Sequence, residues 1–189
     1  DWSSDVCSSD LQSLHRQLRG PVTGLISFAD NDYLGLAQDP RVIAASIAAC
    51  QEFGAGAGAS RLVTGNHALY PKLEAKLASM KNTEAALVFG SGYTANIGII
   101  PALVGPGDVV FADKLVHACI IDGARLSGAK LIRFAHNDMA HLETLLRKHR
   151  AEFKHALITT DHVFSMDGDV APIADIATLA KNYDAWRDR

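Results

Sequence analysis

The feature that most constrains the fold is a repeated alternation of short apolar runs with longer segments of helical periodicity. Each run has the length and composition of a buried strand, and apolar residues in the segment after it recur at helical spacing. We expect strands at 85–89, 108–112, 130–134 and 155–160, followed by helices at 93–103, 116–126, 139–151 and 172–183. Consecutive β-α units predict an α/β fold, with a mostly parallel sheet covered by helices on both faces.

The chain divides into three segments. Residues 1–12 are rich in Ser and Asp, and we expect them to be extraneous to the fold. Residues 13–38 are expected to form an N-terminal extension, and 39–189 to form one incomplete large domain. Two helices are predicted at 40–53 and 68–80, the first capped by Asp39 and ended by Gly54.

Composition excludes several classes of protein. With 48% hydrophobic residues, 21% charged residues and a net charge of −3, the chain is typical of globular proteins and gives no electrostatic case for nucleic-acid binding. No apolar run is long enough to span a bilayer. Cys7, Cys50 and Cys119 lack the spacing of a metal site, and scattered cysteines favour a cytoplasmic protein.

A first candidate site is the Ser91-Gly92-Tyr93 turn, which follows an apolar run and opens a helical segment. Small residues there let a phosphate approach the N–H groups of the first helical turn. The alternative is a simple strand-to-helix turn in which Ser91 only caps the helix. The pattern alone does not separate the two interpretations.

Two further candidates also follow predicted strands, where open α/β sheets build their sites. His117 could stack on a flat ring, although a single His is more often a surface or capping residue. Ser165 could donate a hydrogen bond to a ligand oxygen. The Asp167-Gly168-Asp169 segment after it is typical of a turn.

The glycine-rich segment at 54–60 loosely fits a dinucleotide-binding fingerprint, but a predicted helix precedes it instead of a strand. The simpler interpretation is a flexible connector. The functional one is a loop whose backbone lets Ser60 and Arg61 approach a ligand.

Six stretches in the same order resemble the α-oxoamine synthases, pyridoxal phosphate enzymes of the aspartate aminotransferase fold type (fold type I). They cover most of the chain and read NDYLGL at 31–36, GASRLVTG at 58–65, FGSGYTAN at 89–96, DKLVHA at 113–118, FAHND at 134–138 and VFSMDGD at 163–169. The resemblance implies a truncated large domain of this fold type, with pyridoxal 5'-phosphate as cofactor.

The resemblance also implies roles for individual residues. Gly92 and Tyr93, next to Ser91, would offer backbone N–H groups to the cofactor phosphate. His117 would stack on the pyridine ring and act in catalysis, and Ser165 would hydrogen-bond the phenolic oxygen.

On the substrate side, the family pattern points to residues in the first third of the chain. Asn31 would contact the substrate, and Ser60 would lie near the active site of a partner subunit in a homodimer. The substrate-binding arginine would be Arg16 or Arg19.

The implied reaction is the decarboxylative condensation of L-alanine with a pimeloyl thioester of CoA or carrier protein, a step of biotin biosynthesis. Cys119 and His162 depart from the family pattern, which usually has serine and a small residue there. The Schiff-base lysine and the pyridinium partner are expected outside this sequence, so we expect the chain alone to bind cofactor weakly and not to turn over. The alternatives are another α-oxoamine synthase, such as 2-amino-3-ketobutyrate CoA ligase, or a non-catalytic nucleotide-binding domain.

Overall fold

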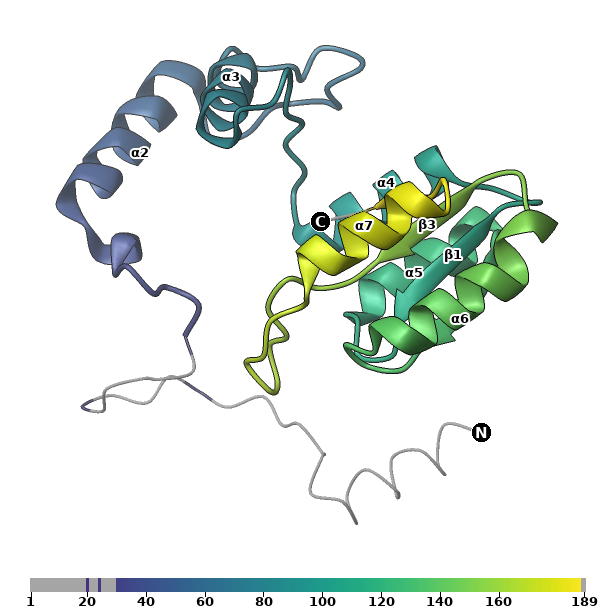
Figure 1. The fold of residues 1–189 in the computed structure, drawn as a ribbon. Coiled ribbons are helices and arrows are strands. Elements are labelled where there is room, and N and C mark those ends of the chain that lie inside the picture. Colours follow the sequence, from purple (N-terminus) through teal and green to yellow (C-terminus); the bar gives the residue numbers. More distant parts are fainter. Residues whose placement is uncertain (1–19, 21–23, 25–29, 188–189) are drawn as a thin grey trace. The chain divides into compact units, whose positions relative to one another are not determined.

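The computed structural model describes residues 20, 24 and 30–187 (Figure 1). The chain divides into two compact units, residues 1–65 and 66–189, which are described separately.

The first unit contains a short 3-10 helix, η1 (Leu36–Gln38), and helix α2 (Pro40–Phe53). The Asp39 carboxylate accepts a hydrogen bond from the backbone N–H of Arg41 at 2.8 Å and pairs with its guanidinium. That hydrogen-bonded guanidinium, with the backbone N–H, lowers the pKa of Asp39 below its usual value. Gly54 ends the helix at a φ of 85°, a conformation that favours glycine. The predicted start and end of this helix are confirmed.

The second unit is built on a parallel sheet of β1 (Val109–Asp113), β2 (Lys130–Phe134), β3 (Ala156–Thr159) and β4 (Trp186–Arg187). The strands lie in the order β2-β1-β3-β4 and every neighbouring pair is parallel. Strands predicted at 108–112, 130–134 and 155–160 are therefore confirmed. The short strand β4 was not predicted, because 186–189 lacks an apolar run.

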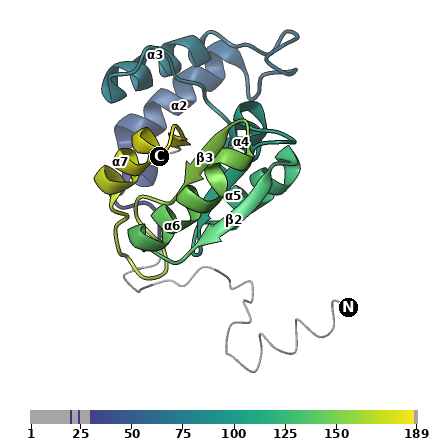
Figure 2. The same ribbon diagram turned by 45° about the vertical axis from the view of Figure 1, so that its right-hand side comes forward.

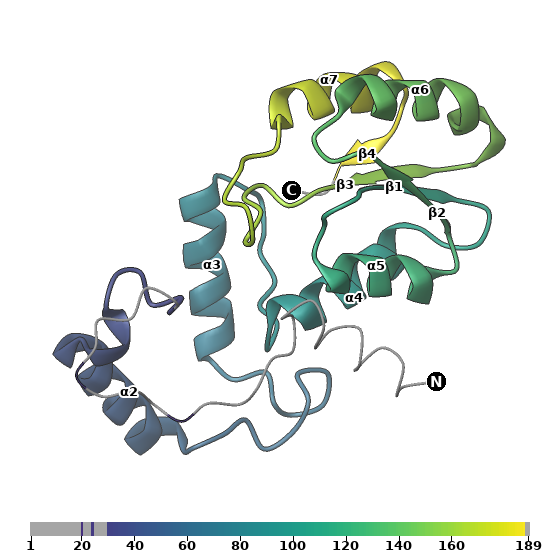
Figure 3. The same cartoon turned by 90° about the horizontal axis from the view of Figure 1, so that it is seen from below.

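Helices cover both faces of this sheet, as predicted (Figures 2 and 3). On one face lie α4 (Gly92–Leu103) and α5 (Ala118–Ser127), and on the other α6 (Met139–His149) and α7 (Ile173–Asn182). A 3-10 turn, η2 (Arg150–Glu152), follows α6. Strand β1 is buried throughout and alternates between the two cores. Val109 and Phe111 pack on the α6 and α7 side, and Val110 and Ala112 on the α4 and α5 side.

The strand predicted at 85–89 is wrong. Residues 85–89 form no strand, and Leu87 is 74% exposed. A strand requires a neighbour that pairs with its backbone, and the four-stranded sheet of the described residues does not include this segment. The backbone N–H of Val88 instead donates to the carboxylate of Glu74 in helix α3 (Leu69–Lys81) at 3.0 Å. An apolar run alone therefore did not decide between a strand and an extended segment.

Candidate functional site

The strand order reverses its direction between β1 and β3, whose carboxyl ends are neighbours in the sheet. From β1 the chain crosses through α5 to β2, and from β2 it crosses back through α6 to β3 on the other side of β1. Helices α5 and α7, which follow the adjacent strands β1 and β3, lie on opposite faces of the sheet. Ligands of open α/β sheets bind outside the strand ends at such a reversal.

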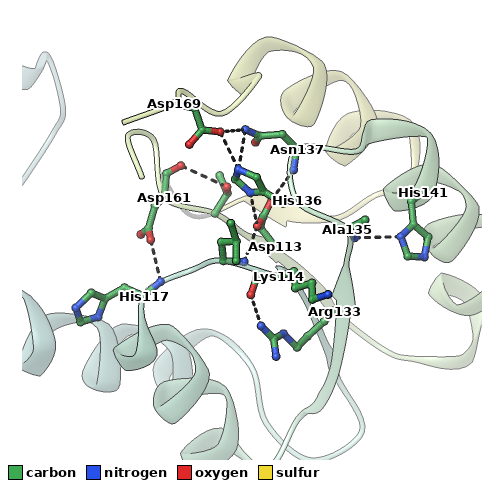
Figure 4. Close-up of polar contacts among 12 residues, drawn as sticks. Asp113, Lys114, His117, Arg133, Ala135, His136, Asn137, His141, Asp161 and Asp169 are labelled. Carbon is green, nitrogen blue, oxygen red and sulfur yellow. Dashed lines mark hydrogen bonds and ion pairs between the residues drawn. The ribbon is translucent and has the colours of Figure 1, made fainter. Parts of the chain in front are cut away.

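His117 follows the carboxyl end of β1 by four residues. Its backbone N–H donates to the carboxylate of Asp161, which follows β3, at 2.8 Å (Figure 4). Its Nδ1 accepts the backbone N–H of Cys119 at 3.2 Å and so caps helix α5. Since Nδ1 is an acceptor, the neutral ring carries its proton on Nε2. The exposed side chain of His117 therefore has an N–H that a ligand can use.

A second set of contacts supports His117 from helix α4. The Asn96 amide donates to the sulfur of Cys119 at 3.0 Å, and that sulfur lies 2.8 Å from Nδ1 of His117. The Cys119 side chain is buried against the α4 and α5 core. The imidazole is thus oriented by Cys119 of α5, which Asn96 of α4 supports, while Asp161 after β3 holds the His117 backbone.

The turn at 91–93 begins helix α4. The Ser91 hydroxyl accepts the backbone N–H of Thr94 at 3.1 Å, which confirms Ser91 as the cap. Gly92 and Tyr93 are the first two helical residues, whose N–H groups precede any intrahelical acceptor. A Cβ at Gly92 would meet nothing within 4 Å, so the backbone is open to an incoming group. The cap uses the N–H of Thr94, so it does not compete for the N–H groups of Gly92 and Tyr93.

Helix α4 is joined to α5 near this turn. The Tyr93 hydroxyl donates to the Asp122 carboxylate at 3.0 Å, and this hydrogen bond raises the pKa of Tyr93. At the next residue of α5 the two helices pack closely, because a Cβ at Gly123 would lie 2.8 Å from the Asn96 carbonyl oxygen. The α4 amino end and His117 are therefore held on adjoining helices.

Ser165 lies in a hairpin after β3, four residues beyond Asp161, and its side chain is exposed. No hydrogen bond joins it to Tyr93 or His117 within the part of the chain that the structure describes. The structure places Ser165 on the same strand end as Asp161 but does not bring it into contact with the other predicted residues.

The predicted substrate residues belong to the first unit, whose placement relative to the second is not determined. Asn31 accepts a hydrogen bond from the Tyr33 hydroxyl at 3.3 Å. Ser60 ends the glycine-rich segment, and its carbonyl accepts the backbone N–H of Gly65 at 2.9 Å. Arg16 and Arg19 lie outside the described residues.

Sequence reasoning missed the residues that orient the site, namely Asp161, Asp122 and Asn96. Asp161 carried a usable signal, because it directly follows a predicted strand. Asp122 and Asn96 carried none, since a polar residue on a helix gives no sign of its partner on another helix. Within residues 30–187 no group of three or more His, Cys, Asp or Glu side chains is placed to hold a metal. No helix of the described chain is long and apolar enough to cross a membrane.

Comparisons with known proteins agree with this architecture. The family model for aminotransferase class I and II matches residues 23–186. An 8-amino-7-oxononanoate synthase from Methylobacterium nodulans is 59% identical over 162 residues, which are 86% of this chain and 43% of that protein. The synthase of the same name from Maricaulis maris is also 59% identical, with 86% and 41% covered. The chain thus spans less than half the length of these curated relatives.

Solved structures of this fold are similar as well. A serine palmitoyltransferase from S. paucimobilis with a bound PLP–myriocin aldimine has a TM-score of 0.79 at 37% identity, covering 82% of this chain and 39% of that one. An 8-amino-7-oxononanoate synthase from Francisella tularensis has a TM-score of 0.67 at 31% identity, with 82% and 42% covered.

Proposed function

The chain belongs to the class I and II aminotransferase family, and on that basis we propose that it is part of a pyridoxal phosphate-dependent acyltransferase. The reaction proposed for the whole protein is that of 8-amino-7-oxononanoate synthase. In this reaction L-alanine condenses with a pimeloyl thioester of CoA or carrier protein, and carbon dioxide leaves. The name shared by several relatives near 60% identity supports this choice within the family.

The observation that carries the proposal is the position of His117, which Asp161 and Cys119 hold beside the carboxyl ends of β1 and β3. Its accessible imidazole suits a flat heteroaromatic ring. The amino end of α4, on the neighbouring helix, suits a phosphate. A phosphorylated pyridine requires these two features together, and the donor set fits it.

In this proposal the backbone N–H groups of Gly92 and Tyr93, beside the Ser91 cap, bind the cofactor phosphate. His117 covers the ring and directs its Nε2 proton towards the substrate carboxylate. Ser165 donates to the phenolic oxygen. When bound, pyridoxal phosphate supplies an electron sink that stabilises negative charge at the substrate α-carbon.

The first unit is proposed to supply the substrate contacts. Asn31 and Ser60 are assigned this role by their positions in the family stretches, and Arg16, with Arg19 as the alternative, by its place near the N-terminus. A carboxylate substrate such as L-alanine is matched by an arginine and an amide.

The whole protein is proposed to be a cytoplasmic homodimer. Cys50 and Cys119 are both free thiols, as is usual in reducing compartments. Helix α2 has no buried residue, and Val42, Ile43 and Ile47 on it are each more than 40% exposed. An apolar helix face of this kind fits a subunit interface.

The phosphate assignment is tested by two substitutions at one position. Proline is tolerated at the first residue of a helix, so Gly92→Pro removes one N–H donor and keeps the helix start. Gly92→Ala is the matched control, because it keeps the N–H and meets no neighbour. We expect Gly92→Pro to weaken pyridoxal phosphate binding about tenfold, as the loss of a charge-assisted hydrogen bond should. Neither variant should change the binding of pyridoxal, which lacks the phosphate.

The ring assignment is tested by His117→Ala, which should weaken the binding of both pyridoxal phosphate and pyridoxal. His149→Ala is the control. Equal affinity for pyridoxal phosphate and pyridoxal in the unmodified chain would refute the site. Tight binding of a dinucleotide without response to pyridoxal phosphate would favour the non-catalytic alternative. In the whole protein, release of carbon dioxide from L-alanine with a pimeloyl thioester is expected. Turnover of glycine with acetyl-CoA instead would point to 2-amino-3-ketobutyrate CoA ligase.

A further inference from the structure

The hairpin at residues 162–171, here called the Ser165 hairpin, carries Ser165 near its tip. Its two sides are joined by backbone hydrogen bonds from Phe164 to the Asp169 carbonyl at 3.0 Å and from Ala171 to the His162 carbonyl at 2.9 Å. The Gly168 N–H donates back to the Phe164 carbonyl at 2.8 Å and closes the tip. The hairpin has a defined shape, but these bonds do not attach it to the sheet.

His136, which follows β2, contacts both sides of this hairpin, and Figure 4 shows its contact with Asp169. Its Nε2 lies 2.7 Å from the carboxylate of Asp169 on one side. Its ring meets the Phe164 ring on the other side in a T-shaped contact, with centroids 4.4 Å apart and planes at 88°. The Phe164 ring is buried in the core, so the imidazole is held between the core and a surface carboxylate.

The other nitrogen of His136 is attached to the sheet. Nδ1 lies 2.9 Å from the carboxylate of Asp113, the last residue of β1, which is fully buried. Asp113 itself accepts the backbone N–H groups of Leu115 and Asn137, each at 2.8 Å. A continuous chain of charge-assisted contacts thus runs from the end of β1 through His136 to the hairpin.

Both ring nitrogens face a carboxylate, so the contacts are complete only when His136 is an imidazolium. The hydrogen bond to Asp113 is the largest cause of a raised pKa for His136. The bond to Asp169 also raises it, and burial opposes both. The charged groups in contact with the ring are Asp113 from β1 and Asp169 from the hairpin. The Asn137 amide, which donates to Asp169 at 2.7 Å, is neutral.

We propose that His136 is a positioning residue, an imidazolium that anchors the Ser165 hairpin to the end of β1 and thereby holds Ser165 in its binding position. The role of Ser165 in this statement rests on the proposed function. The anchoring of the hairpin rests on the contacts of His136 alone.

Anchoring is tested by amide hydrogen exchange on the full chain without cofactor. We expect His136→Gln to lower the protection factors of the Phe164, Gly168 and Ala171 amides by about tenfold or more, as the loss of charge-assisted hydrogen bonds should. The control is His149→Gln. The side chain of His149 is 24% exposed, against 25% for His136, and its Nδ1 also lies beside a carboxylate, that of Glu152 at 3.0 Å. Should His136→Gln fail to fold, Asp169→Asn removes the hairpin half of the anchor and leaves the buried half. Unchanged hairpin protection in these variants overturns the proposal.

The charge of His136 makes the anchoring depend on pH, which an uncharged structural contact would not do. Because the folded pKa is raised above the usual 6.5, the anchoring is fully present below that pH and is lost as the pH rises through the folded pKa. Hairpin protection factors, corrected for the intrinsic exchange rate, should therefore fall with rising pH in the unmodified chain. In His136→Gln the protection factors should not change with pH. If they do not change with pH in the unmodified chain either, the anchor does not depend on a charged His136 and the proposal is overturned.

The link to Ser165 is tested by a double-mutant cycle on pyridoxal phosphate affinity. Ser165→Ala and His136→Gln should each weaken binding, and the double variant should be no weaker than Ser165→Ala. If the double variant loses affinity by the product of the two single losses, His136 does not act through Ser165 and the link is overturned. If Ser165→Ala has no effect, the cofactor role of Ser165 is wrong, and exchange still decides whether His136 anchors the hairpin.

Discussion

The close packing of α4 on α5 predicts opposite effects for the same substitution at two helical glycines. Gly123 in α5 is buried, and a Cβ there would lie 2.8 Å from the Asn96 carbonyl oxygen and 3.0 Å from Cδ1 of Ile100. Gly98 in α4 is exposed, and a Cβ there would meet only Cε1 of Phe89, at 3.5 Å. An added methyl group therefore overpacks the helix contact at Gly123, whereas at Gly98 there is room for it.

The magnitude follows from two contributions. Replacing glycine by alanine inside a helix stabilises by about 1 kcal/mol at either site. A methyl group forced against a backbone oxygen costs about 1–3 kcal/mol, because the α4 backbone must shift. Gly98→Ala should therefore raise the free energy of unfolding. The difference between the two variants isolates the packing cost, so Gly123→Ala should be less stable than Gly98→Ala by about 1–3 kcal/mol.

Urea unfolding followed by circular dichroism measures this difference directly. The shift of α4 should also move its amino end, so Gly123→Ala should weaken pyridoxal phosphate binding while Gly98→Ala should not. Equal stabilities for the two variants would refute the reasoning, since they would show that α4 and α5 do not approach each other at Gly123.

Three further predictions concern the ends of individual elements. Asp108 accepts the backbone N–H of His155 at the amino end of β1, so Asp108→Ala should lower the free energy of unfolding by about 3 kcal/mol in urea titrations and leave pyridoxal phosphate affinity unchanged. Ser91→Ala should lose about 1 kcal/mol with the cap of α4, and a stability equal to the unmodified chain would contradict this. The lowered pKa of Asp39 means that its stabilising effect is present above the usual carboxyl pKa and is lost as the pH falls through the folded value. The Arg41 amide should then lose protection in acid, as NMR exchange can show, and Asp39→Asn should abolish this pH dependence.

Local signals in the sequence determined most of the second unit's elements. Strand β1 was predictable because it is buried on both faces and therefore apolar at every position before Asp113. The start of α4 was predictable from Ser91, because a capping side chain bonds within its own turn. The cofactor, substrate and partner roles of the site residues stay predictions, since they depend on molecules that bind to the chain.

Only the tertiary structure decided which distant groups meet. Residues 85–89 look like a strand, but strand formation depends on a pairing neighbour, which the run itself does not specify. His117 meets Asp161, 44 residues away, because β1 and β3 are adjacent in the sheet although β2 lies between them in sequence. His136 was predicted only as part of the FAHND stretch, and it acquires two carboxylate partners, 23 and 33 residues away, because β1 pairs with β2 on one side and with β3 on the other. Hydrophobic periodicity acts within a few residues and therefore shows in the sequence, whereas ion pairs at strand ends depend on the order in which the strands assemble.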